Sequence, residues 1–315
     1  MSLREKINAL GAAKTPFIFC INYDKTDGFV YEKEKIPPHI KISIDKKQAA
    51  KSKAKPVITN STPISFCDYL CKIEAIKEHI KSGDIYLANL TCETKIQLSG
   101  SLLDIFDSSL AQFRLLVDGQ FVVNSPEEFV KIEDGIISTY PMKGTADFDG
   151  EDSVKALIDD KKELAEHTMA VDLLRNDLAM VSTEVRVEEF RYPLIIEADG
   201  KKLIQTVSKI SGKLESNYES RLGDILFALL PAGSITGTPK RKCIEILEKI
   251  ENYERGFYCG VFGEYDGRTL RSAVAIRYIE QTSEGYAYKS GGGITVDSNP
   301  KSEYEEMIKK VYLAF

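Results

Sequence analysis

The turns between strand-like segments constrain the fold of this chain more tightly than any other feature of its sequence. Segments 257–265 and 269–278 both have strand-like composition, and only the turn around Asp266-Gly267 separates them. A parallel pair of strands needs a crossover of about a dozen residues or more, so a link this short joins antiparallel neighbours. Segments 16–23 and 28–32 repeat the arrangement near the start of the chain. The sequence therefore predicts antiparallel sheets.

Helical and strand-like segments alternate irregularly along the rest of the chain. Residues 66–81 carry apolar side chains at helical spacing and stop at Ser82-Gly83. The sequence has no strand–helix–strand period and no internal repeat. This pattern predicts a single large α+β domain, in which two mostly antiparallel β-sheets pack together with helices on the outside. Further helices are expected at 159–180, 222–230, 240–250 and 300–315, and further strands at 85–98, 113–124, 130–137, 194–214 and 285–289.

Composition and charge exclude several classes of function. The 315 residues carry a formal net charge of −6, which argues against nucleic acid or an anionic membrane as the main partner. The sequence has no apolar run of about 18 residues and no signal-peptide pattern, so we expect a cytoplasmic protein. Its six cysteines show no paired metal-ligand spacing, and we interpret them as small apolar side chains. The lysine-rich stretch 46–55 is interpreted as a solvated loop, with a basic binding patch as the alternative.

Two pairs of glutamates are candidates for a metal site. Glu163 and Glu166 are three residues apart in one predicted helix, and Glu303 and Glu306 repeat the spacing in the last helix. Residues three apart share a helix face, so each pair alone is equally a solvated acidic face. If the two helices face one another, four carboxylates converge and repel unless a cation joins them. Carboxylates without accompanying cysteine or histidine favour Mg²⁺ over Zn²⁺.

A glycine- and hydroxyl-rich loop is a candidate anion site. Residues 231–240 read PAGSITGTPK and lead into a predicted helix, with Thr238 as the expected N-cap and Pro239 as the first helical residue. A flexible loop here would offer free N–H groups, the positive end of the helix dipole and the charge of Lys240. The alternative is an ordinary junction between a loop and a helix.

Two other segments suggest ligand contacts. Arg277 is expected on the strand 269–278, on a face that otherwise carries alanines, where its guanidinium has room to bind a carboxylate. The alternative is an arginine in solvent on an edge strand. The run Gly291-Gly292-Gly293 either lets the backbone approach a ligand closely or forms a plain turn.

The stretch PMKGTA places Lys143 in what the sequence indicates is a tight turn. Judged alone, such a lysine is most simply a surface residue. Glu127 in the sequence SPE precedes it, and pairing between strands could bring this carboxylate beside the lysine. A lysine near a carboxylate in a pocket can act as a nucleophile or as a base.

The order of these segments resembles that of the chorismate-utilising enzymes, which include the anthranilate, isochorismate, salicylate and aminodeoxychorismate synthases. The resemblance runs from about Gly83 to the C-terminus. It implies a fold like that of anthranilate synthase component I, with 61–315 as the chorismate-binding catalytic domain and 1–60 as a short strand region of the same domain. The motifs that carry it are GDIYLANL (83–90), SPE (125–127), PMKGT (141–145), KELAEHTMAVDLLRNDL (162–178), QTVS (205–208), PAGSITGTPK (231–240), RGFYCG (255–260), AIR (275–277), GGGITVDSNP (291–300) and EYEE (303–306).

Within the family, the motifs are most similar to those of aminodeoxychorismate synthase component I. Lys143 stands where anthranilate synthases have alanine, and Gln205 stands where they usually have histidine. The resemblance implies amination of chorismate at C4 to 4-amino-4-deoxychorismate, toward 4-aminobenzoate and folate. Lys143 would add at C2 and expel the C4 hydroxyl, with Glu127 as proton donor, before ammonia adds at C4 and expels the lysine.

The same resemblance implies the other ligands of the site. Mg²⁺ would act as a Lewis acid on the ring carboxylate, with Glu166 and Glu306 as direct ligands. Glu163 and Glu303 would hold coordinated waters. The implied substrate-binding residues are Gly144, Thr145, Ser234, Ile235, Thr236, Gly237, Tyr258, Arg277, Gly291, Gly292, Gly293 and Lys310.

The hypothesis also includes a source of ammonia, and it has several alternatives. The sequence has no Cys-His-Glu amidotransferase pattern, so we expect a glutamine amidotransferase subunit, component II, or free ammonia as the source. We also expect no fused lyase domain. The alternative enzymes are anthranilate synthase component I and the isochorismate and salicylate synthases. A non-catalytic chorismate-binding or scaffold protein is the alternative of a different class, and the candidate catalytic residues argue against it.

Overall fold

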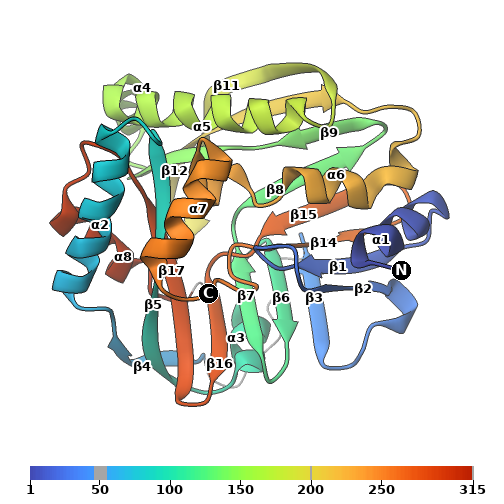
Figure 1. The fold of residues 1–315 in the computed structure, drawn as a ribbon, viewed down its shortest axis with the longest axis horizontal. Helices are drawn as coiled ribbons and strands as arrows, with labels where there is room; N and C mark the ends of the chain where they lie inside the picture. The colour runs from blue at the N-terminus through green and yellow to red at the C-terminus, as the bar shows by residue number, and fades with distance from the viewer. Residues whose placement is uncertain (46–54, 199–200, 314–315) are drawn as a thin grey trace.

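Two large sheets form the centre of the fold in the computed structural model, which describes residues 1–45, 55–198 and 201–313 (Figure 1). All the strand pairs within these residues are antiparallel. The predicted α+β fold with two antiparallel sheets is therefore confirmed.

The first sheet contains strands from both ends and from the middle of the chain. Its order is β10-β12-β9-β8-β15-β14-β1-β2, and β11 pairs with β12. The strands are β10 (Met142–Asp147), β12 (Lys201–Lys213), β9 (Ile136–Thr139), β8 (Glu128–Glu133), β15 (Leu270–Val274), β14 (Val261–Tyr265), β1 (Phe17–Ile21), β2 (Gly28–Glu32) and β11 (Thr183–Ala198).

The second sheet is built around the long strand β5. Its order is β13-β5-β17-β16-β7-β6-β3, and β4 pairs with β5. The strands are β13 (Gly237–Thr238), β5 (Leu87–Ser99), β17 (Gly285–Ile294), β16 (Tyr278–Thr282), β7 (Phe121–Ser125), β6 (Phe113–Val117), β3 (Ile40–Ile44) and β4 (Val57–Thr62).

The helices lie outside the two sheets (Figure 1). In the part of the chain that the structure describes, none is both long and apolar enough to cross a membrane. They are α1 (Leu3–Ala12), α2 (Phe66–Lys81), α3 (Leu102–Ser108), α4 (Glu151–Asp159), α5 (Lys161–Ala179), α6 (Leu222–Leu229), α7 (Lys240–Glu251) and α8 (Pro300–Lys309).

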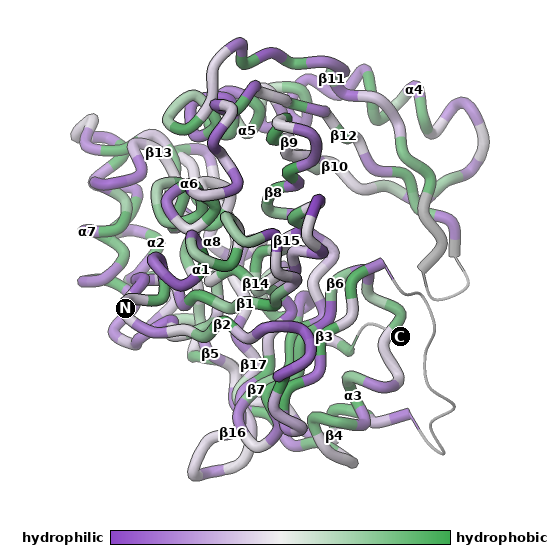
Figure 2. The backbone as a smooth tube through the Cα atoms, turned by 90° about the vertical axis from the view of Figure 1, so that its right-hand side faces the viewer, coloured by the Kyte–Doolittle hydropathy of each residue, from purple (hydrophilic) through white to green (hydrophobic). Residues whose placement is uncertain are grey.

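The main hydrophobic core lies between the sheets. All five residues of β1, with the sequence FIFCI, are buried, as an apolar strand without alternation predicts. The Phe17 and Tyr265 rings from the neighbouring strands β1 and β14 lie 5.3 Å apart between centroids. Figure 2 shows hydrophobic stretches of β1 and β14 in the middle of the molecule. Burial of these aromatic side chains fixes the central strands of the first sheet, to which β10 of the candidate site also belongs.

The chain passes from one sheet to the other between Val274 and Tyr278, which corrects the predicted strand 269–278. β15 ends at Val274 in the first sheet, and β16 begins at Tyr278 in the second. Arg277 lies in the link with a φ of 54°, a left-handed backbone conformation that is uncommon outside glycine. The alternation of Arg277 with alanines on one strand face, which the sequence indicated, is therefore wrong.

Several other element boundaries differ from the predictions. α1 and α4 were not predicted, although the capping box formed by Ser2 and Glu5 marks the start of α1. The short helix α3 was not predicted either. β11 begins at Thr183, earlier than the expected 194, and β12 begins at Lys201, so the predicted strand 194–214 falls in two strands. α8 ends at Lys309, before the expected 315. The lysine-rich stretch 46–55 falls almost wholly outside the described residues.

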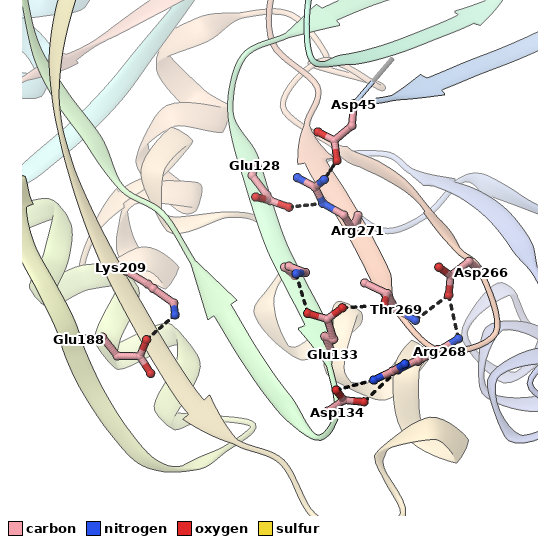
Figure 3. Close-up of polar contacts among 11 residues, drawn as sticks. Asp45, Glu128, Glu133, Asp134, Glu188, Lys209, Asp266, Arg268, Thr269 and Arg271 are labelled. Carbon is pink, nitrogen blue, oxygen red and sulfur yellow. Dashed lines mark hydrogen bonds and ion pairs between the residues drawn. The ribbon is translucent and has the colours of Figure 1, made fainter. Parts of the chain in front are cut away.

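The face of the first sheet that points away from the core is polar. Side chains alternate along a strand, so Leu270 is buried in the core while Arg271 lies on the opposite face. Figure 3 shows Arg271 paired with both Asp45 and Glu128, with its Nε 2.7 Å from a Glu128 oxygen. Further ion pairs on this side join Lys209 to Glu188 and Arg268 to Asp134. Because these groups satisfy one another, we assign this face no ligand.

A buried ion pair joins α7 to the turn that follows it. The Arg255 and Glu251 side chains are only 2% and 3% exposed, and their nearest charged atoms lie 2.7 Å apart. Arg255 also donates to the carbonyls of Ile235 and Asn89, each at 2.8 Å. The Glu251 carboxylate accepts from both the N–H and the hydroxyl of Thr91. One charged cluster therefore connects α7, β5 and the loop around residue 235.

We expect Arg255→Met to destabilise the fold by about 3–5 kcal/mol, because the Glu251 carboxylate would stay buried without its partner. Urea or thermal unfolding followed by circular dichroism measures the change. Glu284→Gln, which removes an exposed pair with Lys95, is the control and should leave the transition in place. An Arg255→Met transition that overlays the wild-type curve would contradict the role given to this pair.

Candidate active site

Lys143 lies in a strand, not in the tight turn that its sequence indicated. β10 pairs with β12 so that Lys143 is opposite Thr206 and Thr145 is opposite Gln205, which leaves Gly144 as a bulge. Gly144 has a φ of 69°, a conformation that glycine adopts at low cost. A bulge of this kind redirects the neighbouring side chains. The Lys143 side chain is exposed, although its strand is paired.

A buried chain of hydrogen bonds holds the Lys143 backbone. The Thr206 hydroxyl donates to the Lys143 carbonyl at 2.5 Å and lies 3.3 Å from Nδ1 of His167. Nε2 of His167 lies 2.6 Å from the Ser208 hydroxyl. Burial, with the charges of Arg191 and Lys143, lowers the pKa of His167 to about 4, so the imidazole is neutral at neutral pH. Sequence reasoning assigned these residues no role; the available signal was two hydroxyls spaced two apart, which places them on the same face of β12.

Glu127 approaches Lys143 from the link between β7 and β8. Its Oε1 accepts a hydrogen bond of 2.5 Å from the Ser234 hydroxyl. Burial raises the pKa of Glu127, while the Ser234 hydrogen bond and the charge of Lys143 oppose that rise. A carboxyl group with a raised pKa keeps its proton at higher pH, which suits a proton donor. The structure thus brings together Glu127, Ser234 and Lys143.

The first glutamate pair lies beside the bulge. A side-chain carbon added at Gly144 would lie 3.0 Å from Oε2 of Glu163. Burial and the neighbouring charge of Glu166 raise the pKa of Glu163, and the charge of Lys143 lowers it. Thr145, also exposed, accepts a hydrogen bond of 3.1 Å from the Gln205 amide. Glycine at 144 therefore leaves the space that Glu163 occupies next to Lys143.

The second glutamate pair lies on α8, within electrostatic reach of α5. Asn299 caps α8 and Pro300 is its first residue, as predicted. Burial raises the pKa of Glu303, and the charges of Lys310 and Lys162 partly offset this rise. For Glu306, burial is outweighed by a hydrogen bond from Lys310 and by the charges of Lys310, Lys143 and Lys162, which together lower the pKa. Since Lys162 belongs to α5, the glutamate pairs of the two helices share one electrostatic environment.

The donor set matches the chemistry of a hard divalent cation. All four candidate ligands are carboxylates, and each pair contains one glutamate whose pKa burial and a like charge raise. Lysine ammonium groups stand beside the other two, with Lys162 3.8 Å from Glu166 and Lys310 2.8 Å from Glu306. Within residues 1–45, 55–198 and 201–313, no three His, Cys, Asp or Glu side chains gather closely enough to hold a metal ion. The four glutamates are the type of ligand that Mg²⁺ prefers, and they are arranged as two separate pairs.

The loop 231–240 is packed and rigid, which corrects the prediction of a flexible anion loop. Thr236 is fully buried, with its hydroxyl bonded to the Ala232 carbonyl at 2.7 Å. A side-chain carbon at Gly237 would lie 2.2 Å from the Leu87 carbonyl oxygen. Ile235 is also buried, whereas Ser234 is exposed and its hydroxyl donates to Glu127.

The predicted helix N-terminus also differs at this loop. α7 begins at Lys240 with Pro239 at the N-cap, so Thr238 is not its cap. The Lys240 ammonium lies 2.7 Å from Asp177 and donates to the Leu229 carbonyl at 3.0 Å. Its charge is therefore used inside the protein and does not contribute to an anion site.

The three glycines at 291–293 lie in β17, opposite residues 89–91 of β5, and form no turn. A side-chain carbon at Gly292 would lie 3.6 Å from Nζ of Lys310 and 3.7 Å from Oε2 of Glu303. The Lys310 ammonium also donates to the Gly291 carbonyl at 2.8 Å. The glycine strand thus lets α8 and Lys310 approach the sheet closely, and the plain turn is excluded. The expected approach of a ligand to this backbone stays a prediction.

Arg277 and Tyr258 lie on the side of the site nearest the sheet crossing. Arg277 is half-buried and donates to the Lys310 carbonyl at 3.2 Å. Tyr258 is buried, 5.8 Å from the Tyr278 ring, and burial raises its pKa well above the usual value. Lys310 therefore connects Arg277 to the glutamates of α8, whereas the Tyr258 side chain lies in the core.

The sequence of this chain is similar to that of known proteins. Residues 20–314 match the family model described as chorismate binding enzyme. The chain is 42% identical over 312 residues to a "PabA-like" protein of Haemophilus influenzae, covering 98% of this chain and 95% of that one. It is 35% identical over 255 residues to "Aminodeoxychorismate synthase component 1" of Bacillus subtilis, covering 76% of this chain and 53% of that one. It therefore spans about half the length of the Bacillus protein.

Solved structures agree with this match. Anthranilate synthase component I from Streptococcus pneumoniae superposes with a TM-score of 0.68 at 26% identity, over 81% of this chain and 58% of that one. The isochorismate synthase MenF from Escherichia coli superposes with a TM-score of 0.70 at 17% identity, over 93% and 77% of the two chains, which shows a shared fold. The chain is a member of the family of chorismate-binding enzymes.

Proposed function

We propose that this chain is component I of an aminodeoxychorismate synthase, which aminates chorismate at C4 to give 4-amino-4-deoxychorismate. The observation that carries the proposal is the position of Lys143, exposed on a bulged strand between Glu127 and the glutamates of α5 and α8. Relatives with the name aminodeoxychorismate synthase component 1 in Bacillus subtilis and Salmonella typhimurium support it.

The proposed chemistry uses Lys143 as the nucleophile. Its amine forms a bond to C2 of the ring, both conjugated ring double bonds shift, and the C4 hydroxyl leaves as water after taking the proton of Glu127. Ammonia then adds at C4, both double bonds shift back, the Lys143 amine is released, and the new C4 ammonium group returns a proton to Glu127. The Thr206 hydroxyl holds the Lys143 carbonyl, and this fixed backbone orients the amine toward the ring.

The glutamate pairs are the proposed metal ligands. Glu166 and Glu306 would hold Mg²⁺ directly, and Glu163 and Glu303 would hold its waters. The bound ion would supply a Lewis acid for the ring carboxylate. The glutamates contribute oxygen ligands held on two helices, and Ser298 orients Glu303 through a hydrogen bond of 2.9 Å.

The cationic groups of the site suit a dianionic substrate. Arg277 and Lys310 would bind the carboxylate of the enolpyruvyl side chain, and the backbone of residues 291–293 would give that group close access. The proposal is supported by the hydrogen bond from Arg277 to the Lys310 carbonyl and by that from Lys310 to the Gly291 carbonyl. Ser234 remains available for a substrate oxygen when it is not bonded to Glu127. Ammonia would come from a glutamine amidotransferase subunit, component II, or from solution.

A product assay tests the proposed reaction. We expect the purified chain with Mg²⁺, chorismate and ammonium salt to form 4-amino-4-deoxychorismate, identified by chromatography and mass spectrometry. Lys143→Ala should reduce the rate by at least about 100-fold, because it removes the nucleophile. Anthranilate or salicylate as the sole product of the wild-type chain would refute the proposal.

The covalent step has its own test. In the absence of ammonia, we expect chorismate to leave a mass adduct on the peptide that contains Lys143, because the second amine that would release the lysine is missing. Peptide mapping after denaturation locates the label. Lys143→Ala is the matched control and should stay unlabelled, while a wild-type peptide without label would remove the nucleophile role and leave the product assay to stand by itself.

Metal dependence is the third expectation. EDTA should abolish turnover, and added Mg²⁺ should restore it. Glu306→Gln should weaken Mg²⁺ binding measured by isothermal titration calorimetry, because it removes a carboxylate ligand. Glu305→Gln, one position away on α8, is the control and should bind Mg²⁺ as the wild type does. Full activity in EDTA would exclude the metal from the mechanism.

A further inference from the structure

The Arg277 guanidinium is held without a carboxylate. The residue lies where the chain crosses between the two sheets, and its backbone is fixed in the left-handed region with its carbonyl bonded to the Asn124 N–H. In residues 1–45, 55–198 and 201–313, no carboxylate oxygen lies within 4.0 Å of this side chain. Its charge therefore remains available to an incoming anion.

The Tyr312 ring supports the Arg277 guanidinium in place of a carboxylate. The centre of the Arg277 guanidinium lies 4.6 Å from the centroid of the Tyr312 ring. The adjacent backbone is fixed on both sides, since Arg277 donates to the Lys310 carbonyl at 3.2 Å and the Tyr288 hydroxyl donates to the Tyr312 carbonyl at 3.1 Å. Tyr288 is only 1% exposed, whereas the Tyr312 side chain is 42% exposed.

The two kinds of support have different electrostatic consequences. A carboxylate partner would fix the guanidinium but neutralise its charge, and the substrate carboxylate would then have to displace it. An aromatic face attracts the cation through its quadrupole without neutralising its charge. Val311 and Leu313, which flank the ring in sequence, pack against the hydrophobic cluster around Ile105 and Phe106. The segment is thereby anchored while the ring stays at the surface.

We propose that Tyr312 is a positioning residue, which holds the Arg277 guanidinium in the orientation that receives a substrate carboxylate. This inference rests on the proposed function, because it assigns Arg277 to the enolpyruvyl carboxylate of chorismate. Tyr312 itself makes no contact with the reacting carbons. Its loss therefore weakens substrate binding and leaves the chemical step unchanged.

The test compares two substitutions at one exposed position. Tyr312→Ala should raise the KM for chorismate about two- to tenfold with kcat unchanged, since it removes a cation–π contact. Tyr312→Phe keeps the ring and should behave like the wild type, and both variants should keep the wild-type melting temperature. In an Arg277→Met background, Tyr312→Ala should have no further effect, because the residue acts through the guanidinium.

Equilibrium dialysis of chorismate with Mg²⁺ distinguishes failure of the positioning role from failure of the proposed function. Every chain compared, including the one that is wild type at Tyr312, carries Lys143→Ala, so that no adduct forms. If the wild type binds chorismate and Tyr312→Ala binds it equally well, the positioning role is overturned and the proposed function stands. The same conclusion follows if Tyr312→Phe is as weak as Tyr312→Ala, or if Tyr312→Ala weakens binding equally in the Arg277→Met background. A wild-type chain that does not bind chorismate overturns both proposals.

Discussion

The buried ion pair between Arg255 and Glu251 is the interaction on which the arrangement of the site depends. Burial of two charges is tolerated when hydrogen bonds satisfy their polar atoms. Arg255 donates to the carbonyls of Ile235 and Asn89 as well as to Glu251, and Glu251 also accepts from Thr91 of β5. The loop is therefore rigid beside Ser234, and that rigidity presents the Ser234 hydroxyl to Glu127.

The position of Lys143 depends on a different device, which restrains the backbone and leaves the side chain free. The carbonyl of Lys143 is bonded to Thr206, and Thr206 is backed by His167, whose burial keeps it neutral. A charged imidazole at this point would repel the ammonium group, so the low pKa of His167 matters for the lysine. The bulge at Gly144 completes the arrangement, because it turns the strand without adding a side chain in front of Glu163.

Features set by local interactions could be predicted from the sequence. The helix at 66–81 was predicted to the residue, because apolar spacing and the Ser82-Gly83 stop determine it locally. The cap of α8 and the antiparallel hairpins are local in the same sense. The family resemblance was confirmed by the match over residues 20–314. The roles of individual site residues remain predictions.

Features that depend on distant partners could not be predicted. Lys240 could bind an anionic ligand or pair with a carboxylate of the protein. Asp177, which lies on another helix, decides for the second. The strand 269–278 looks continuous in sequence, and only packing against two different sheets breaks it at Arg277. The bulge at Gly144 has the same origin, since it requires the register between β10 and β12. In each case the tertiary partner decides between two locally acceptable conformations.

The distribution of charge explains how a chain with a net charge of −6 can offer a site to an anion. Burial raises the pKa of Glu127, Glu163 and Glu303, which disfavours their negative forms. Lys143 and Lys310 lie among these carboxyls, and Lys143 acts on residues from three separate elements. A dianion that enters with a divalent cation would find positive groups for its carboxylates and carboxylates for its metal. If the proposed Mg²⁺ is the cofactor, neither ligand would neutralise the site alone, and the same charges would favour binding of the two together.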